Sequence, residues 1–330
     1  MKILITGVAG FIWHSLAIDF LKNKNNTIVG IDNFSTYSGK EIKYLRIKLL
    51  KKYKNFRLIN IDIKNKKKID LLFKKNNFDI VVHLAAEVGV RYSIIRPDKY
   101  VDANINGFFN IIDSLKHNPP KKFLFASSSS VYGDTKVFPL KENLNLEPIN
   151  MYALSKKNNE EVAKIYSKKY KTKFIGLRFF TVFGERGRPD MFFFKMILSV
   201  FKNGKLYLNN SGNHYRDFTY IKDVVIILRK LISLKVKNKY EILNICSSRP
   251  VFLKNFIKIS EKYLKKILNK FMISNNYQYT NSWKYKTTNN ESTRLIMIAI
   301  KIAKKRGMKS FLKAVKGKLY RNQLIKSGQI

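Results

Sequence analysis

A tyrosine and a lysine four residues apart, Tyr152 and Lys156, form the part of this 330-residue chain best suited to proton transfer. Side chains at this spacing lie on the same face of a helix, so the Lys156 ammonium is expected beside the Tyr152 phenol. A positive charge there favours the phenolate and lowers a phenol pKa that is about 10 when unperturbed. Tyr152 is therefore a candidate general base near neutral pH. The spacing alone is a weak signal, because both residue types are common in this sequence.

The elements that must position this pair begin at the start of the chain. The apolar run 2–5 predicts a buried parallel strand, and it leads directly into Gly7 and Gly10. Glycines there let the backbone approach a pyrophosphate, whose charge is met by the amides at a helix N-terminus. A second strand, 27–31, ends at Asp32. An acid at this place hydrogen-bonds a ribose diol and repels a 2′-phosphate, which favours NAD over NADP.

Three later apolar runs continue the pattern of strands, at 56–61, 79–84 and 123–126. The first leads into Asp62-Ile63, the second into Ala85-Ala86, and the third into the serines 127–130. The carboxyl ends of parallel strands meet at one edge of a sheet, where nucleotide cofactors bind. The sequence therefore predicts an α/β fold with a doubly wound parallel sheet of Rossmann type, and it brings the serines to the cofactor edge.

Seven ordered stretches of the sequence resemble the extended short-chain dehydrogenase/reductases that act on nucleotide sugars, in the NAD-dependent epimerase/dehydratase family. They are TGVAGFI (6–12), DNF (32–34), HLAAEVGVRYS (83–93), SSSSVYG (127–133), LRFFTVFG (177–184), GRPDM (187–191) and RDFTYI (216–221). Ordered motifs agree by chance far less often than any single motif. Within the family, the chain is most similar to the UDP-glucuronate 4-epimerases. The resemblance implies a Rossmann-type sheet with a smaller C-terminal substrate-binding lobe.

The resemblance implies a catalytic role for three residues. Ser128 matches the family's catalytic Ser or Thr and would hydrogen-bond the sugar O4. Tyr152 would take the O4 proton while the C4 hydride passes to NAD, and Lys156 would hold the nicotinamide ribose. The resulting 4-keto sugar turns in the pocket and takes the hydride back on its other face. The implied reaction therefore exchanges UDP-glucuronate and UDP-galacturonate without net redox change.

The resemblance also implies a set of cofactor contacts and a set of substrate contacts. The residues expected to bind NAD are Gly7, Gly10, Phe11, Ile12, Asp32, Asn33, Asp62, Ile63, Leu84, Ala85, Ala86, Asn104, Tyr152, Lys156 and Phe179. Those expected to bind the UDP-sugar are Ser129, Ser130, Thr181, Arg188 and Arg216.

Substrate choice is predicted from four of these positions. Ser129 and Ser130 lack the carboxyl groups that dehydratases and decarboxylases of the family carry there, which favours epimerisation. Thr181 and Arg188 match positions that meet the sugar carboxylate in glucuronate epimerases, and a guanidinium holds a carboxylate through two parallel hydrogen bonds. Arg216 matches the family's diphosphate-binding arginine. No position in the sequence has the spacing of a metal site.

The chain departs from its family at two places. Trp13 stands at the third glycine of the GxxGxxG fingerprint, where glycine normally lets helix and strand pack closely. Overpacking of this kind typically costs about 1 to 3 kcal/mol, so NAD affinity is expected to suffer. The second departure is 278–281, where the family shows a Gln-Pro-Gly-Asp segment that contacts the nucleotide and this chain reads Gln-Tyr-Thr-Asn.

Length and composition agree with a two-lobed enzyme. We expect a cofactor domain over 1–180, with later returns near 220–250, and an interleaved substrate lobe over 181–330. A signal peptide is rejected because the first apolar run stops after four residues, and the apolar stretches are shorter than the roughly 20 residues that span a bilayer. The single cysteine, Cys246, excludes an internal disulfide, which favours the cytoplasm.

The net charge of +43 raises the alternative of nucleic-acid binding. The charge is mostly lysine, scattered among asparagine and isoleucine as an AT-rich genome would encode, and no nucleic-acid motif accompanies it. We therefore expect no specific nucleic-acid partner. The resemblance implies instead a homodimer, formed by the segment 104–116 and the helix that carries Tyr152.

Two alternatives to the glucuronate epimerase stay open. The first is a 4-epimerase of the UDP-glucose or UDP-N-acetylglucosamine type, in which Arg188 meets no carboxylate. The second is a decayed family member that binds NAD weakly because of Trp13.

Overall fold

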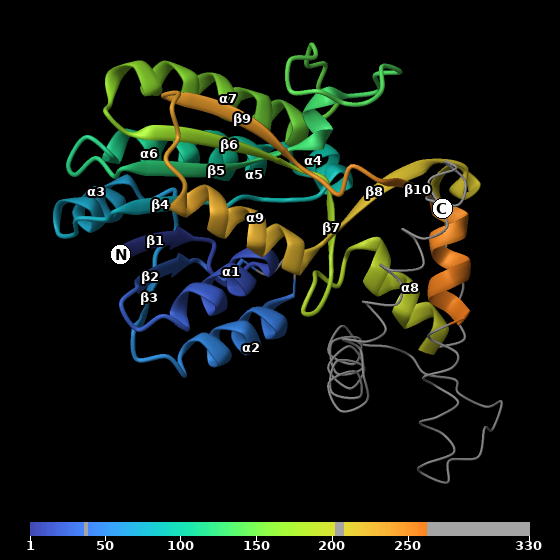
Figure 1. Cartoon of the computed structure of the whole chain (residues 1–330), viewed down its shortest axis with the longest axis horizontal. Coiled ribbons are helices and arrows are strands. Elements are labelled where there is room, and N and C mark those ends of the chain that lie inside the picture. The colour runs from blue at the N-terminus through green and yellow to red at the C-terminus, as the bar shows by residue number, and fades with distance from the viewer. Residues whose placement is uncertain (36–38, 202–207, 263–330) are drawn as a thin grey trace, which may run out of the picture. The chain divides into compact units, whose positions relative to one another are not determined.

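The computed structural model describes residues 1–35, 39–201 and 208–262 of the chain (Figure 1). These residues divide into two compact units. The first unit comprises 1–35, 43–180 and 221–246. The described residues of the second unit are 39–42, 181–201, 208–220 and 247–262. The predicted nucleotide segment at 278–281 lies outside the described residues.

A seven-stranded sheet forms the centre of the first unit, in the order β3-β2-β1-β4-β5-β6-β9, and every neighbouring pair is parallel. The strands are β1 (Lys2–Thr6), β2 (Thr27–Asp32), β3 (Phe56–Asn60), β4 (Ile80–His83), β5 (Lys122–Ser128), β6 (Lys173–Phe179) and β9 (Tyr240–Ile245). The strand order reverses between β1 and β4, which is the switch point where such sheets bind nucleotides. The predicted Rossmann-type parallel sheet is confirmed.

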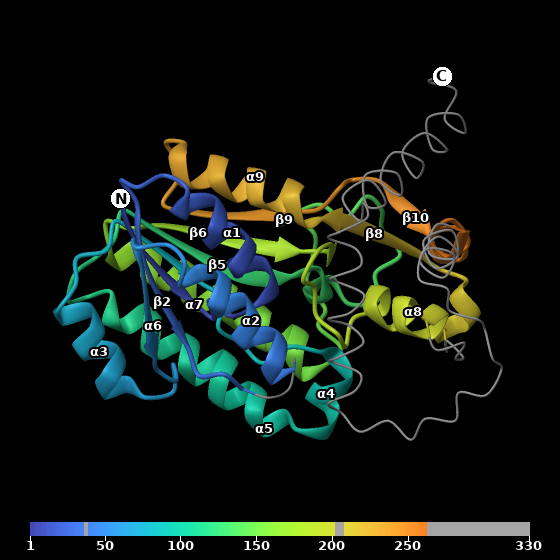
Figure 2. The same cartoon turned by 90° about the horizontal axis from the view of Figure 1, so that it is seen from below.

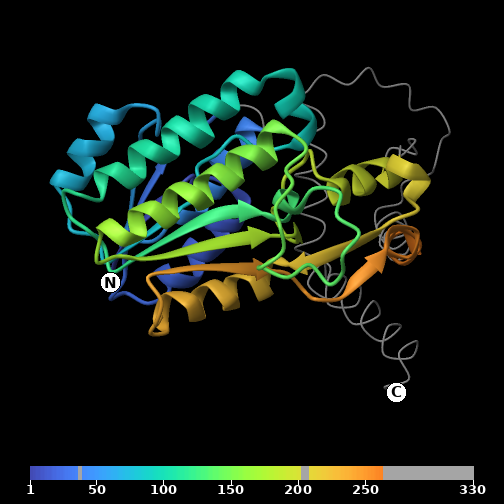
Figure 3. The same cartoon turned by 90° about the horizontal axis from the view of Figure 1, so that it is seen from above.

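Helices cover both faces of this sheet (Figures 2 and 3). They are α1 (Phe11–Leu21), α2 (Lys40–Leu50), α3 (Lys66–Lys74), α4 (Val90–Ile95), α5 (Pro97–Tyr100), α6 (Gly107–Ser114), α7 (Met151–Lys169) and α9 (Ile221–Ser233). The helices α1, α2 and α9 lie on one face, and α3, α6 and α7 lie on the other. Strands covered on both faces need apolar side chains throughout, as in the fully buried Ile3-Leu4-Ile5.

Two short irregular helices interrupt the regular pattern near the carboxyl edge of the sheet. Residues Val101–Asn106 form a π-helix between α5 and α6, and Ser129–Tyr132 form a 3-10 helix directly after β5. Single π-turns inserted in α-helices occur mostly at functional sites, because they redirect side chains. Both segments carry residues that the sequence assigned to the site, Asn104 in the first and Ser129-Ser130 in the second.

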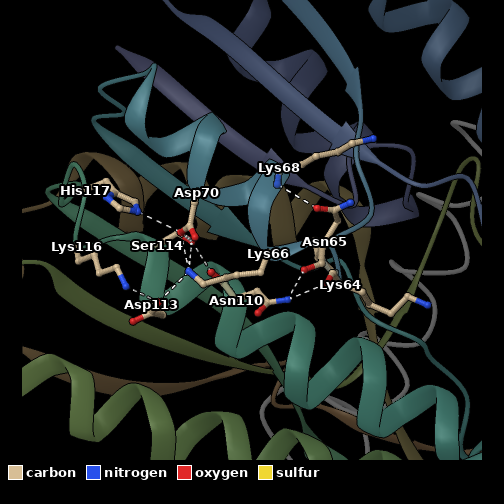
Figure 4. A network of polar contacts seen from close by, with 11 residues as sticks. Lys64, Asn65, Lys66, Lys68, Asp70, Asn110, Asp113, Ser114, Lys116 and His117 are labelled. Carbon is tan, nitrogen blue, oxygen red and sulfur yellow. Dashed lines mark hydrogen bonds and ion pairs between the residues drawn. The ribbon is translucent and has the colours of Figure 1, made fainter.

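A polar network fastens α3 to α6 (Figure 4). Lys66 Nζ lies 2.6 Å from Asp70 Oδ1 and 2.8 Å from Asp113 Oδ2, and Ser114 Oγ donates to Asp70 Oδ1 at 2.7 Å. Burial works to raise the pKa of Asp70, but the bonds from Lys66 and Ser114 outweigh it and lower that pKa to about 2. His117 adds a contact of 3.2 Å to the same carboxylate. The network fixes one side of α6 to the body of the unit.

The second unit contains a three-stranded sheet in the order β10-β8-β7. Its elements are β7 (Thr181–Phe183), α8 (Phe192–Phe201), the 3-10 helix Asn209–Gly212, β8 (Tyr215–Tyr220) and β10 (Pro250–Phe252). Its core is aromatic: Phe218 stacks on Phe256 with ring centroids 4.0 Å apart, and Phe183 packs edge-on against both rings.

None of the described helices combines the length and the apolar character needed to cross a bilayer. Over the same described ranges, no group of three or more His, Cys, Asp or Glu side chains is arranged to hold a metal ion.

Candidate functional site

The glycine turn after β1 lies where the sequence placed it. Gly7 has a φ of +71°, and a Cβ added to it would lie 2.9 Å from the backbone nitrogen of Ala85. Only glycine fits such a close approach of two backbones. Gly10 caps α1, which begins at Phe11, and its amide donates to Gly7 O at 2.8 Å. The first amides of a helix have no partner within the helix, so this turn presents donors to an anion.

The acid at the end of β2 is buried and held by the backbone. The Asp32 carboxylate accepts from the amides of Ala9 at 3.0 Å and Phe34 at 2.8 Å. Lys43 Nζ lies 3.6 Å from Asp32 Oδ1, with both side chains less than a tenth exposed. Asn33 donates to Asp62 at 3.1 Å, which joins two further residues of the predicted cofactor set. The ends of β2 and β3 are therefore linked by side chains.

Thr6 organises the start of the loop after β4. Its hydroxyl oxygen accepts from the amides of Leu84 at 3.1 Å and Ala85 at 3.0 Å, and lies 2.9 Å from Nδ1 of His83. Because the oxygen already accepts two N–H groups, its own proton goes to Nδ1, and His83 is neutral with its proton on Nε2. Burial and then the charge of Lys156 lower the pKa of His83 to about 3. His83 is therefore a structural residue of β4.

The serine run occupies the end of β5 and the turn beyond it. Ser128 is the last residue of the strand and is 7% exposed. The Ser128 hydroxyl caps the 3-10 helix Ser129–Tyr132 by accepting from the amide of Ser130 at 3.2 Å. It also donates to the Ser130 hydroxyl at 3.2 Å. This short helix packs against α7. The turn that contains these serines therefore lies against the helix that carries Tyr152 and Lys156.

Helix α7 positions Tyr152 and Lys156 in its first two turns. The Asn150 side chain caps the helix by accepting from the amide of Ala153 at 2.9 Å, which fixes where the helix begins. Lys156 is 3% exposed, and its Nζ lies 5.9 Å from the centroid of the Tyr152 ring. Burial lowers the pKa of Lys156 to about 8. The Tyr152 ring packs edge-on against Tyr100.

Asn104, in the π-helix, braces this region with its side chain. The amide nitrogen donates to Ser155 Oγ and to Glu87 O, both at 3.0 Å, and the oxygen accepts from the amide of Glu87 at 2.7 Å. Asn104 therefore connects the loop after β4 to α7 between Tyr152 and Lys156.

A buried ion pair lies behind these residues. Arg178 and Glu160 are 3% and 2% exposed, and they form two hydrogen bonds at 2.9 and 2.7 Å. Ser127 Oγ donates to the same carboxylate at 2.5 Å, and Arg178 also donates to Tyr132 Oη at 2.9 Å. Burial works to lower the pKa of Arg178, but the bonds to Glu160 outweigh it and raise that pKa, so the guanidinium stays charged.

The Trp13 side chain, on α1, is buried in the interior of the first unit. The indole is 3% exposed and packs edge-to-face on Phe179, with ring centroids 6.5 Å apart and an interplanar angle of 79°. A Cβ built on Gly10 would lie 3.8 Å from Trp13 Cδ1, which is ordinary van der Waals contact. Phe179 is the last residue of β6 and belongs to the predicted cofactor set. Trp13 thus packs directly behind one predicted wall of the NAD site.

The second unit holds the three remaining predicted substrate residues. Thr181 begins β7, Arg188 lies in the loop before α8, and Arg216 lies in β8. Arg188 forms a two-pronged pair with Asp190, with Nε–Oδ1 at 3.0 Å and Nη2–Oδ2 at 2.5 Å. The fork geometry that suits a sugar carboxylate is therefore already used on a protein carboxylate.

Four residues that the sequence analysis gave no role prove to organise the site: Thr6, Lys43, Glu160 and Arg178. The sequence contained a recognisable pattern for two of them, Glu160 and Arg178. Glu160 follows Lys156 by four residues, which puts it on the same face of α7, and Arg178 is the only charge inside the apolar part of β6. Lys43 lies in a lysine-rich helix, where nothing local distinguishes it.

A parallel doubly wound sheet with a glycine turn after β1, an acid after β2, and a tyrosine with a buried lysine on α7 defines a short-chain dehydrogenase/reductase. Comparison with known proteins narrows the class. The model of the NAD dependent epimerase/dehydratase family matches residues 3–246 of this chain. The chain belongs to this family, which confirms the resemblance found in the sequence, and NAD is the family's cofactor.

Individual relatives are similar over most of the chain. An uncharacterized protein of Methanocaldococcus jannaschii is 41% identical over 82% of this chain and 83% of its own length. The UDP-glucuronate 4-epimerase of Thermodesulfobacterium geofontis is 35% identical over 80% of each chain. Among solved structures, UDP-glucuronic acid 4-epimerase from Bacillus cereus, in complex with UDP-glucuronic acid and NAD, superposes with a TM-score of 0.75 at 34% identity, covering 82% of this chain and 83% of that one.

Proposed function

We propose that this chain is a UDP-sugar 4-epimerase that interconverts UDP-glucuronate and UDP-galacturonate. The observation that carries the proposal is Lys156, a buried lysine beside Tyr152 on α7, next to the serine turn that follows β5. A buried ammonium next to a phenol is a device for deprotonating an alcohol. The curated and structural relatives named UDP-glucuronate 4-epimerase support the same substrate.

Three residues of the first unit perform the proton chemistry in this proposal. Ser128 hydrogen-bonds the sugar O4 and orients it. Tyr152, as a phenolate, takes the O4 proton in one half of the reaction and returns it in the other, and the Lys156 charge stabilises the phenolate with which the cycle begins and ends. NAD, when bound, supplies reversible hydride acceptance. The 4-keto sugar must be free to turn while its nucleotide stays held.

The described residues fit NAD at the sheet edge. The space a Cβ would fill at Gly7, the donors at the start of α1 and the buried Asp32 carboxylate suit a dinucleotide with an unmodified ribose. We propose the cofactor contacts as expected from the sequence, with Asn33, Asp62, Ile63, Leu84, Ala85, Ala86, Asn104 and Phe179 completing the set. Asn104 and Asp32 would bind with side chains that also hold the backbone.

The substrate contacts are proposed as the sequence predicts them. Ser129 and Ser130 would contact the sugar, Thr181 and Arg188 its carboxylate, and Arg216 the diphosphate. Asp190 is the residue that the sugar carboxylate would have to replace as partner of Arg188. This exchange of one carboxylate for another gives the site a preference for uronates over neutral hexoses.

We also propose a homodimer in the cytoplasm, with the cofactor and substrate lobes divided as the sequence predicts. The observation behind the dimer is apolar exposure on α6 and α7: Phe109 is 46%, Leu154 45% and Ile165 66% exposed. The network of Figure 4 fixes α6 to α3 through the contact of Lys66 with Asp113, while these apolar side chains stay exposed. Ile165→Asp should then convert a dimer to a monomer in light scattering, and an unchanged mass would contradict the assignment.

The direct test is proton NMR of UDP-glucuronate incubated with the full-length protein and added NAD. Appearance of the galacturonate H1 and H4 signals without net NADH is the expected result. Conversion of UDP-glucose or UDP-N-acetylglucosamine, with no conversion of UDP-glucuronate, would replace the substrate assignment by the hexose epimerase. A folded protein that converts none of the three and releases no NAD on denaturation would support the decayed family member and overturn the proposal.

A further inference from the structure

The ion pair between Glu160 and Arg178 joins four separate segments around the proposed catalytic set. Glu160 lies on α7 and Arg178 on β6. Ser127 on β5 donates to Glu160, and Tyr132, at the end of the serine turn, accepts from Arg178 and donates to Asn244 on β9 at 2.8 Å. The bonds of Ser127 to Glu160 and of Arg178 to Tyr132 are buried, and buried hydrogen bonds are stronger than those at the surface.

The sequence positions of these residues relate them closely to the catalytic set. Ser127 immediately precedes Ser128, and its partner across the β5–β6 ladder is Arg178, whose own partner on β9 is Asn244. Glu160 lies one helical turn beyond Lys156 on the same face of α7. The network therefore fixes the strand end that carries Ser128 to the helix that carries Tyr152 and Lys156.

Burying Glu160 and Arg178 costs desolvation free energy, which the attraction between them does not always repay. Replacing a buried ion pair by apolar residues of similar volume is often neutral or stabilising, whereas removing one partner is strongly destabilising. We therefore look for the role of the pair in the geometry that it fixes. The planar fork of Arg178 uses both oxygens of one carboxylate and a phenol oxygen at once, and so it accepts only one relative placement of α7, β6 and the serine turn.

We propose that Glu160 and Arg178, through Ser127 and Tyr132, are positioning residues that set the placement of Tyr152 and Lys156 relative to Ser128. This inference deepens the proposed function and rests on it. None of the four touches the reacting atoms in the proposal. They act by holding the base and the serine in register, and a misplacement of about 1 Å can cost on the order of a hundredfold in rate.

The first test is Ser127→Ala, which removes one hydroxyl and leaves the ion pair intact. The matched control is Ser167→Ala, because Ser167 is also buried but donates only to Lys164 O near the far end of α7. We expect Ser127→Ala to lower kcat roughly tenfold, with KM changed less than about threefold, while the control keeps the wild-type values. Equal kcat in the two variants would overturn the inference.

The second test separates positioning from stability. Glu160→Gln should lower both the unfolding temperature and kcat, because it leaves Arg178 buried without its counter-charge. The triple variant Ser127→Ala/Glu160→Leu/Arg178→Met makes the network apolar, while Tyr132 keeps Asn244 as a partner. We expect the triple variant to regain most of the unfolding temperature and to remain at least about tenfold low in kcat. Recovery of kcat together with stability would show a purely structural pair.

Failure of the proposed function would be seen separately. If the wild-type protein converts no UDP-sugar, the reaction assignment fails, and positioning is then measured by NAD released on denaturation. Because Lys156 is assigned to the nicotinamide ribose, Glu160→Gln should retain less NAD than Ser167→Ala. Equal NAD content in these two variants would overturn the inference whatever the reaction is.

Discussion

The carboxyl edge of the first unit and the arginine-bearing surface of the second are built in opposite ways. In the first unit, Ser128 and Lys156 are less than a tenth exposed and lie among buried side chains that hydrogen-bond one another. In the second, Arg216 is exposed, and Arg188 is a fifth exposed at its side chain and held by a neighbouring acid. The residues proposed for chemistry are thus fixed before substrate arrives, whereas Arg188, proposed for recognition, has a partner that a ligand can replace.

In the second unit, side-chain hydrogen bonds hold the turn before β10. Asp217 accepts from the amides of Ser247 and Arg249 and from the hydroxyls of Ser247 and Thr219. Arg216, the residue before this aspartate, is therefore carried on a braced backbone although its side chain is exposed. The two units therefore differ in how their functional side chains are held, and not in how their strands are held.

Removing the phenol hydroxyl should produce the largest loss. Tyr152→Phe takes away the proposed base and leaves the ring that packs on Tyr100, so kcat is expected to fall by about 10² to 10⁴ with little change in KM. Turnover of UDP-glucuronate measures this. Tyr170→Phe, which removes a buried hydroxyl near the end of the same helix, is the control and should retain activity. Full activity in Tyr152→Phe would refute the base assignment.

Changing the arginine of the second unit should affect one substrate class only. Arg188→Ala removes the fork proposed for the sugar carboxylate, and kcat/KM for UDP-glucuronate should fall by roughly 10- to 150-fold, the effect of a lost charged hydrogen bond. Turnover of UDP-glucose, if any is detected, should not change. Asp190→Asn sharpens the test, because it weakens the competing carboxylate and should lower KM for UDP-glucuronate. An Arg188→Ala variant with wild-type glucuronate turnover would refute the clamp.

The buried lysine should make activity and stability respond to pH in opposite directions. Because burial lowers the pKa of Lys156 from 10.5 to about 8, the folded protein binds fewer protons than the unfolded chain between these two values. This group therefore adds stability as pH rises from about 8 to 10.5, whereas loss of the ammonium lowers kcat above about pH 8. A pH–rate profile checks the second effect. Lys156→Arg, which keeps its charge, should shift the fall to higher pH, and an unshifted fall would contradict the assignment.

The smallest expected effect concerns the tryptophan at the fingerprint. Trp13→Gly should raise the NAD retained per chain a few-fold by relieving the contact with Phe179, although loss of a buried indole costs stability, typically about 3 to 5 kcal/mol. Cofactor released on denaturation and the unfolding temperature measure the two effects. Trp13→Phe is the matched variant that keeps most of the packing. Equal NAD release from wild type and Trp13→Gly would refute the proposed interference.

Sequence reasoning predicted the strands, the glycine turn and the parallel sheet, and it missed several side-chain pairings at the site. The strand end at Asp32 and the turn at Gly7 follow from short apolar runs and glycine chemistry, and the structure has them there. The strand predicted over 123–126 is longer in the structure, Lys122–Ser128, because the first two serines continue the ladder with β6. The pairing of Arg188 with Asp190 was missed although the two are adjacent in the sequence motif, because motif matching assigned the arginine to a ligand. The contact of Lys43 with Asp32 was beyond reach, since nothing in a lysine-rich helix indicates which lysine turns inward.

The last strand of the large sheet has a consequence for synthesis of the chain. β9 pairs with β6, yet 181–220, most of the described second unit, lies between them in sequence. Until residues 240–245 leave the ribosome, β6 pairs only with β5 and its other edge has no partner, and Tyr132 lacks its bond to Asn244. Such edges promote association between chains. The nascent protein thus has a vulnerable interval that ends only when its discontinuous first unit is completed.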